Sequence, residues 1–267
     1  MDINKPFKII VAHPDDEILF FNSIITSANQ IVICFGRCSN SEAVTSGRER
    51  LKLNYPFDNV KFLDIPESDV YDSLTFKNRT IIPEGVSVHK DHLSYKANFD
   101  NLREQLRKEL AKGDTIFTHN PWGEYGHPEH VQVFSAIRSL VNEFNLSVFV
   151  NGYVSDKTFE MMTNRYFLLS TESFVAQPND ELGQKLKTIY MTNNCWTWGD
   201  DYKWPSMEIF YCLSTDGKNS FSIKTNSAYP PLNLLTKKFT KSFLAYQILR
   251  FIPDHFKSIM KRILKNK

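Results

Sequence analysis

Short apolar runs that alternate with longer amphipathic segments are the feature of this sequence that most constrains its fold. Helical periodicity predicts helices at 16–27, 47–54, 91–112 and 129–144. Segment 66–88 is predicted to be a long loop that contains a short strand. Strands alternating with helices indicate an α/β fold with a mostly parallel sheet. Strands are expected at 7–12, 30–35, 60–64, 115–118 and 146–150, of which 7–12 and 115–118 are expected to be buried.

The composition is that of a folded globular protein. With 267 residues, 42% of them apolar and 23% charged, the chain is long enough for one large domain with a buried core. The four cysteines include no C-x-x-C pair, which predicts reduced thiols. The N-terminal segment lacks the pattern of a signal peptide, and no run reaches the ~20 apolar residues of a membrane-spanning helix. We therefore expect cytoplasmic residence.

Charge is distributed unevenly along the chain, although the net charge is only +2. Residues 236–267 hold nine Lys and Arg and one acid, whereas residues 1–235 hold 23 basic and 29 acidic residues. The sequence therefore predicts a mildly acidic domain at 1–235, followed by a basic tail at 236–267. An acidic body argues against a nucleic-acid-binding surface.

The tail has the pattern of a basic amphipathic helix that is split at Pro253. Such a helix can lie at the surface of an anionic membrane, which would bring the protein peripherally to its inner face. Packing of the tail on the acidic body, or binding to a partner protein, are the alternatives. The apolar face comprises Phe256, Ile259, Met260, Ile263 and Leu264, and the bases are Lys237, Lys238, Lys241, Arg250, Lys257, Lys261, Arg262, Lys265 and Lys267.

The segment A-H-P-D-D-E at 12–17 follows directly after the first predicted strand. His13 and Asp16 are three residues apart at a strand-to-helix turn, so their side chains can meet at one metal ion. Asp15 lies between them and can face a water molecule on the same metal. The alternative is that the acids only cap the following helix, but this leaves His13 at the end of an apolar strand unexplained.

A second histidine pair, His127 and His130, opens the helix predicted at 129–144. Each imidazole can bind a metal, stabilise a charge or transfer a proton. An H-x-x-H pair is a weak signal, and His89 and His92 form another that we interpret as an exposed helix start. His119 and His255 are left without a role and are expected to be structural.

Together the two segments offer three metal ligands: His13, Asp16 and one histidine of the second pair. Three protein ligands and an open position are typical of a catalytic zinc, whereas structural zinc usually has four protein ligands. Zinc lowers the pKa of a bound water and polarises a carbonyl. The same donors also accept iron or cobalt, so Fe²⁺ is an alternative to Zn²⁺. Ligands of parallel sheets bind outside the carboxyl ends of the strands, where both segments are expected.

In these two motifs the sequence resembles the LmbE-like family, which includes the GlcNAc-phosphatidylinositol de-N-acetylases (PIG-L). The resemblance rests on A-H-P-D-D-E at 12–17 and T-H-N-P-W-G-E-Y-G-H-P-E-H at 118–130, and it extends from residue 7 to about residue 213. Weaker likenesses are R-E-R at 48–50 and E-I-F at 208–210. The resemblance implies a Rossmann-like three-layer fold and zinc-dependent removal of acetyl from a sugar amine.

The resemblance also assigns roles to individual residues. His13, Asp16 and His130 match the metal ligands, Asp15 matches the general base, and His127 matches the residue that stabilises the tetrahedral intermediate in protonated form. Position 129 is Glu where the family more often has Asp. Candidates for holding the sugar, each equally explained by surface packing, are Arg48, Arg50, Trp122 and Tyr125.

The expected partner is an N-acetylated amino sugar or glycolipid. A different amide, such as a thiol-conjugate amide, is an alternative substrate for the same site. A sugar-binding module with a vestigial metal site is a further alternative. It is disfavoured because Asp15 and His127 are both present and binding alone requires neither.

Overall fold

A seven-stranded sheet forms the centre of the computed structural model, which describes residues 5–71, 76, 79–214 and 232–235. Its strand order is β3-β2-β1-β6-β7-β10-β9. The first five strands run parallel, whereas β10 pairs antiparallel with both β7 and β9. These strands are β1 (Lys8–Val11), β2 (Gln30–Arg37), β3 (Val60–Pro66), β6 (Thr115–Thr118), β7 (Ser147–Asn151), β9 (Leu169–Ala176) and β10 (Glu208–Leu213).

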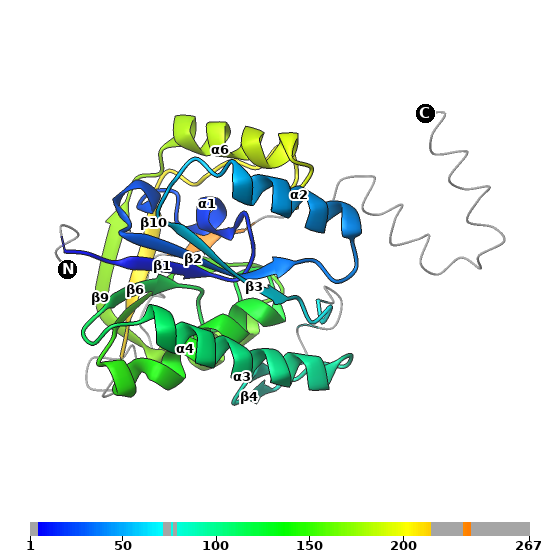
Figure 1. The fold of residues 1–267 in the computed structure, drawn as a ribbon. Coiled ribbons are helices and arrows are strands. Elements are labelled where there is room, and N and C mark those ends of the chain that lie inside the picture. The colour runs from blue at the N-terminus through cyan, green and yellow to red at the C-terminus, as the bar shows by residue number, and fades with distance from the viewer. Residues whose placement is uncertain (1–4, 72–75, 77–78, 215–231, 236–267) are drawn as a thin grey trace. The chain divides into compact units, whose positions relative to one another are not determined.

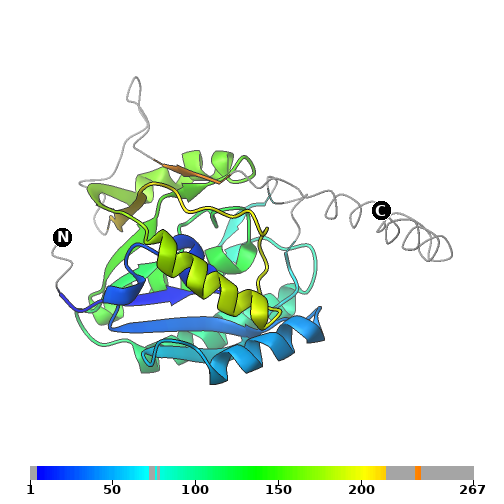
Figure 2. The same ribbon diagram turned by 90° about the horizontal axis from the view of Figure 1, so that it is seen from above.

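Helices cover both faces of this sheet, which gives three layers (Figure 1). Helices α1 (Asp16–Phe20), α2 (Glu42–Leu53) and α6 (Asp180–Thr192) lie on one face (Figure 1), and Figure 2, seen from above, shows α6 in front of the strands. Helices α3 (His92–Glu109) and α4 (Pro128–Phe144) lie on the other face and pack against each other. The predicted α/β fold with a mostly parallel sheet is therefore confirmed.

Smaller elements complete the described part of the chain. They are η1 (Ile25–Ser27), the hairpin strands β4 (Ile81–Ile82) and β5 (Gly85–Val86), β8 (Tyr153–Val154), α5 (Phe159–Arg165), η3 (Tyr166–Leu168) and β11 (Asn233–Leu234). The pair β4 and β5 lies in the segment that was predicted to be a loop with a short strand.

The helix predicted at 16–27 is shorter than expected, because α1 ends at Phe20. The backbone N–H of Ser23 donates to the Glu208 carboxylate at 2.9 Å, instead of continuing the helical hydrogen bonds. Helix α2, by contrast, begins earlier than the expected residue 47. Ser41 caps it, and its side chain accepts from the Val44 N–H.

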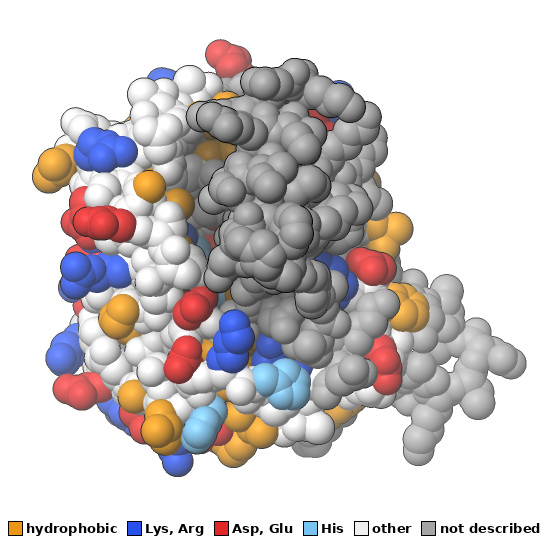
Figure 3. All heavy atoms as spheres, turned by 90° about the vertical axis from the view of Figure 1, so that its right-hand side faces the viewer, with side chains coloured by type: hydrophobic (Ala, Val, Ile, Leu, Met, Phe, Trp, Pro, Cys, Tyr) orange, Lys and Arg blue, Asp and Glu red, His pale blue; other side chains and the backbone are white. Residues whose placement is uncertain are grey.

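The chain divides into two units, of which the first comprises residues 1–197 and 203–235 and holds the whole sheet. The second combines 198–202 with 236–267, and the predicted basic tail and His255 lie outside the described residues. No helix among the described residues is both long and apolar enough to cross a membrane. Figure 3 shows acidic and basic side chains interspersed over the described part of one face.

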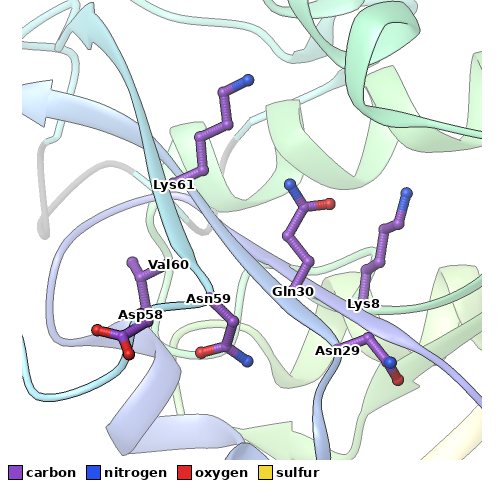
Figure 4. A pocket seen from close by; sticks show the side chains of 7 residues that line it. All are labelled: Lys8, Asn29, Gln30, Asp58, Asn59, Val60 and Lys61. Atoms are coloured by element: carbon purple, nitrogen blue, oxygen red, sulfur yellow. The ribbon is translucent and has the colours of Figure 1, made fainter.

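An open hollow of about 520 Å³ lies at the amino ends of β1, β2 and β3 (Figure 4). Its two lysines are already paired, Lys8 with Asp114 at 2.8 Å and Lys61 with Glu109 at 2.6 Å. Because both sequence motifs follow the carboxyl ends of their strands, this hollow is at the opposite end of the sheet from them.

Candidate active site

The sheet brings the two sequence motifs to one place. The chain moves outward from β1 to β2 and β3, and then returns to place β6 on the other side of β1. The carboxyl ends of β1 and β6 are therefore neighbours at a reversal of strand order, where α/β sheets bind ligands. His13 follows β1, and His127 and His130 open α4 after β6.

Three side-chain atoms form a nearly equilateral triangle at this point. His13 Nδ1, Asp16 Oδ2 and His130 Nε2 lie 3.3 Å from one another in each pairing. Ligand atoms at about 2.0–2.1 Å from a tetrahedral zinc are themselves about 3.3–3.4 Å apart. The triangle thus has the size that a divalent metal with three protein ligands requires, and the cluster is able to hold a metal.

The remaining nitrogen of each histidine in the triangle faces a buried carboxylate. His13 Nε2 is 2.8 Å from Glu129 Oε2, and His130 Nδ1 is 2.7 Å from Glu124 Oε2. A carboxylate accepts a hydrogen bond, so each of these nitrogens carries the proton. The lone pairs then lie on His13 Nδ1 and His130 Nε2, the two nitrogens of the triangle.

The cluster is electrostatically suited to a cation. Burial opposes protonation of His13, but Asp16 and Glu129 outweigh it and raise the His13 pKa to about 10. Burial also opposes ionisation of Asp16, yet His130 and its neighbours hold the Asp16 pKa well below its usual range. Protons on histidines or a bound metal ion must offset this excess of buried carboxylates.

Asp15 sits in a strained backbone conformation beside the triangle, with φ at 100°. Its Oδ2 accepts hydrogen bonds from the Thr197 hydroxyl at 2.7 Å and from the Thr197 N–H at 3.1 Å. The Glu17 carboxylate accepts the Asp15 N–H at 3.1 Å. Burial, together with the Asp16 charge, raises the pKa of Asp15 to about 8, whereas a cation nearby would favour the ionised form.

His127 caps α4 and lies against the triangle. The Glu129 N–H donates to His127 Nδ1 at 3.3 Å, so Nε2 carries the proton of the neutral ring. The Tyr71 ring stacks on this imidazole with a centroid distance of 4.8 Å and an interplanar angle of 6°. Tyr125 packs edge-on against both His127 and His130, at 5.9 Å and 5.1 Å.

His119 lies within the cluster, although the sequence left it without a role. Its ring stacks on His130 at 3.9 Å, and its Nε2 is 3.4 Å from Asp16 Oδ2. The Ala12 N–H donates to the same Nε2 at 2.8 Å, which occupies the lone pair that a metal would need. We therefore regard His119 as a packing neighbour of His130 and Asp16 and not as a metal ligand.

The four residues predicted to hold the sugar differ from one another in burial and in distance from the site. Tyr125 is half-buried at the site, and Arg48 is buried in an ion pair with Glu67. Arg50 lies on the exposed side of α2 and donates to the Asn193 carbonyl at 2.9 Å. The expectation for Trp122 is corrected, because its ring is fully buried and its Nε1 donates to the Tyr153 carbonyl, so it cannot stack on a sugar.

Three residues that contact the site were missed from the sequence: Tyr71, Glu124 and Thr197. Glu124 lies inside the second motif, between two glycines with positive φ, but a lone acid in a Gly-rich loop predicts only a turn. Tyr71 and Thr197 are separated from both motifs by long stretches of sequence. Only the tertiary fold brings them to His127 and Asp15.

Comparison with known proteins identifies the family. The family model of the GlcNAc-PI de-N-acetylases, PIG-L, matches residues 8–141, which is half of the chain and includes both motifs. The chain belongs to the PIG-L family. In this PIG-L family member the matched range covers the whole triangle, Asp15 and His127, and it confirms the resemblance drawn from the two motifs.

The chain has no significant match among curated proteins. Two solved structures resemble this PIG-L family member, both described as a deacetylase in the biosynthesis pathway of teicoplanin. One is a complex with teicoplanin and the other a complex with bog. Each is 13% identical and is matched over 79% of this chain and 100% of its own, with TM-scores of 0.47 and 0.49.

Proposed function

We propose that this protein is a metal-dependent N-deacetylase, which hydrolyses the acetamido group of an N-acetylated amino sugar in a glycoconjugate or glycolipid precursor. The observation that carries the proposal is the triangle of His13, Asp16 and His130, with the Asp15 carboxylate and the His127 imidazole beside it. Family membership supports deacetylation as the reaction. Zinc is the proposed metal, with Fe²⁺ as the alternative for the same donors.

When bound to the triangle, a divalent metal would polarise the acetyl carbonyl and lower the pKa of a water molecule. The residues beside the metal would accept and donate the protons of the reaction. Both Thr197 hydrogen bonds converge on Asp15 Oδ2, so we assign Oδ1 as the acceptor of the proton from the attacking water. The Nε2–H of His127 would donate to the oxyanion that forms at the acetyl carbonyl oxygen.

Collapse of the tetrahedral intermediate breaks the bond between the acetyl carbon and the sugar nitrogen. The leaving nitrogen needs a proton, and Asp15, which took one from water, is assigned to deliver it. The products are acetate and a free amino sugar. The partly exposed rings of Tyr71 and Tyr125 lie next to His127 and are proposed to contact the sugar.

Acetate release in the presence and absence of metal tests this function. Protein purified without chelator is expected to carry about one divalent metal per chain and to release acetate from N-acetylated glycans or glycolipids. Dialysis against a chelator should abolish the release, and added Zn²⁺ should restore it.

The same assay weighs the alternatives. Preferential cleavage of a thiol-conjugate amide would change the proposed substrate class but not the proposed reaction, which is amide hydrolysis. Protein that binds an amino sugar but hydrolyses neither compound, with metal bound, would favour the vestigial binding module. Contact of residues 236–267 with a membrane stays a prediction from the sequence.

Thr197→Val tests the positioning of Asp15. The substitution keeps the shape of the side chain and the backbone N–H, but it removes the hydroxyl that donates to Oδ2 at 2.7 Å. A hydrogen bond to a charged group contributes about 1.5–3 kcal/mol, so kcat is expected to fall about tenfold or more, with KM and metal content little changed. Thr197→Ser retains the hydroxyl and should keep most of the activity. Equal kcat values for the Val and Ser variants would show that Thr197 does not position the base.

A further inference from the structure

We propose that Glu124 is a positioning residue, which holds His130 in the one tautomer that can bind the metal. This inference rests on the proposed metal site and adds a residue outside the ligand set. Glu124 is fully buried, and its Oε2 lies 2.7 Å from His130 Nδ1. A neutral imidazole has one proton, so a proton held on Nδ1 leaves the lone pair on Nε2.

His130 is the ligand for which this choice matters most. Its Nε2 is the nitrogen that lies 3.3 Å from both Asp16 Oδ2 and His13 Nδ1. If the proton moved to Nε2, the same nitrogen would become a donor and could bind no metal. The ring is fully buried, with His119 stacked on it at 3.9 Å. A flip of the ring to exchange the two nitrogens is therefore blocked by packing.

The conformation of the loop around Glu124 fixes the direction of its carboxylate toward His130. Glu124 has φ at 47°, in the left-handed region, and Gly123 and Gly126 on either side have φ at 72° and 97°. The Asn120 side-chain oxygen accepts the N–H of Trp122 and of Glu124, each at 3.2 Å, and so closes the turn.

The hydrogen bonds that the other oxygen of Glu124 accepts require this carboxylate to be ionised. Oε1 accepts the Asn120 N–H at 3.0 Å and the Asn151 side-chain amide at 2.6 Å, and it lies 3.2 Å from His119 Nδ1, while Oε2 faces His130. Both oxygens are thus acceptors, and every partner is a donor. A glutamine offers only one acceptor, so its NH₂ group must face either His130 or the Asn120 and Asn151 donors.

Glu124→Gln is therefore expected to weaken zinc binding. In the arrangement that satisfies Asn120 and Asn151, the glutamine NH₂ points at His130 Nδ1. That nitrogen then serves as the acceptor, and the proton shifts to Nε2. Loss of an outer partner of this kind typically lowers metal affinity about 10–100-fold. The measurement is competition for Zn²⁺ against a chromophoric chelator, with the full-length protein.

Glu208→Gln is the matched control. Glu208 is also a fully buried carboxylate that accepts several hydrogen bonds, from Ser23 and from the Tyr153 hydroxyl at 3.0 Å, but it contacts no member of the triangle. Its variant should bind zinc as tightly as the wild type. If both variants lose affinity equally, or if neither does, Glu124 has no specific part in holding His130.

A measurement on the wild type keeps the inference testable even if the Glu124 variant does not fold. In zinc-loaded protein labelled with ¹⁵N-histidine, the His130 signals should show a proton on Nδ1 and the metal on Nε2. The reverse assignment, or a His130 that is not coordinated, would overturn the inference. Tight zinc binding that Glu124→Gln weakens, without acetate release from any substrate, would instead refute only the deacetylase function.

Discussion

Replacing Asp15 by asparagine is expected to lower kcat for acetate release by about 10²–10⁴-fold, the usual contribution of a general base. The amide cannot accept the proton of the attacking water, although it has nearly the same shape as the carboxylate. The triangle of His13, Asp16 and His130 is untouched, so zinc content should stay at about one per chain.

The structure indicates that Asp15→Asn will fold. Asparagine tolerates left-handed backbone angles better than most residues, which suits the φ of 100° at this position. Its single oxygen can take the place of Oδ2 and accept both hydrogen bonds from Thr197. The NH₂ group then occupies the position from which Oδ1 is assigned to accept the proton.

Asp91→Asn is the matched control for this variant. Asp91 is another aspartate with a positive φ, at 45°, but it is exposed at the start of α3. Its asparagine variant should keep full activity. An Asp15→Asn enzyme with wild-type kcat would remove Asp15 as the base, and loss of zinc from that variant would indicate that Asp15 is a ligand.

The fold was largely predictable because most of its parallel strands are short apolar runs, although the edge strand β3 also contains Lys61 and Asp64. Strand 115–118 was predicted with the bounds that β6 has, and the α/β class followed from the alternation with helices. The early end of α1 could not be predicted. The Glu208 carboxylate that accepts the Ser23 N–H comes from a strand 185 residues away, and no local pattern records that contact.

The site was predictable to the extent that it is local in sequence. His13 and Asp16 lie within one turn, as do His127 and His130, and the strand-to-helix context of each pair placed both at one end of the sheet. The carboxylates that face the histidines were harder to recognise. Glu129 was noted only as an unusual residue in the motif, yet its Oε2 lies 2.8 Å from His13 Nε2.

Trp122 is the reverse case, because it was predicted to be at the site and the structure places it in the core. An aromatic residue next to a metal motif is a reasonable candidate for stacking on a sugar, and the sequence contains nothing to distinguish it from Tyr125. The structure separates them, because the Trp122 indole packs against Tyr166 and donates to the Tyr153 carbonyl in the core. Tyr125 instead lies against the two histidines of α4.

His130→Ala is expected to lose zinc and His127→Ala to keep it, although both should lose most of the activity. His130 Nε2 is a corner of the triangle, so its loss should lower zinc affinity by more than the roughly 10–100-fold that outer partners contribute. His127 uses its Nδ1 to accept the Glu129 N–H at the start of α4. Its alanine variant should therefore keep zinc and lose the donor to the oxyanion, at a cost to kcat of about 10²–10³-fold.

The comparison between these two variants decides whether His127 is a ligand, because His13, His127 and His130 could also hold a metal together. The rings of His127 and His130 are stacked at 4.9 Å, so the two sets of donors are adjacent. The even 3.3 Å spacing favours the set that includes Asp16, whose carboxylate also balances the charge of a divalent ion. Zinc analysis of both variants after gel filtration is the measurement. Retention of zinc by His130→Ala together with its loss from His127→Ala would exchange the two roles. Loss of zinc from both variants would instead assign the metal to His13, His127 and His130.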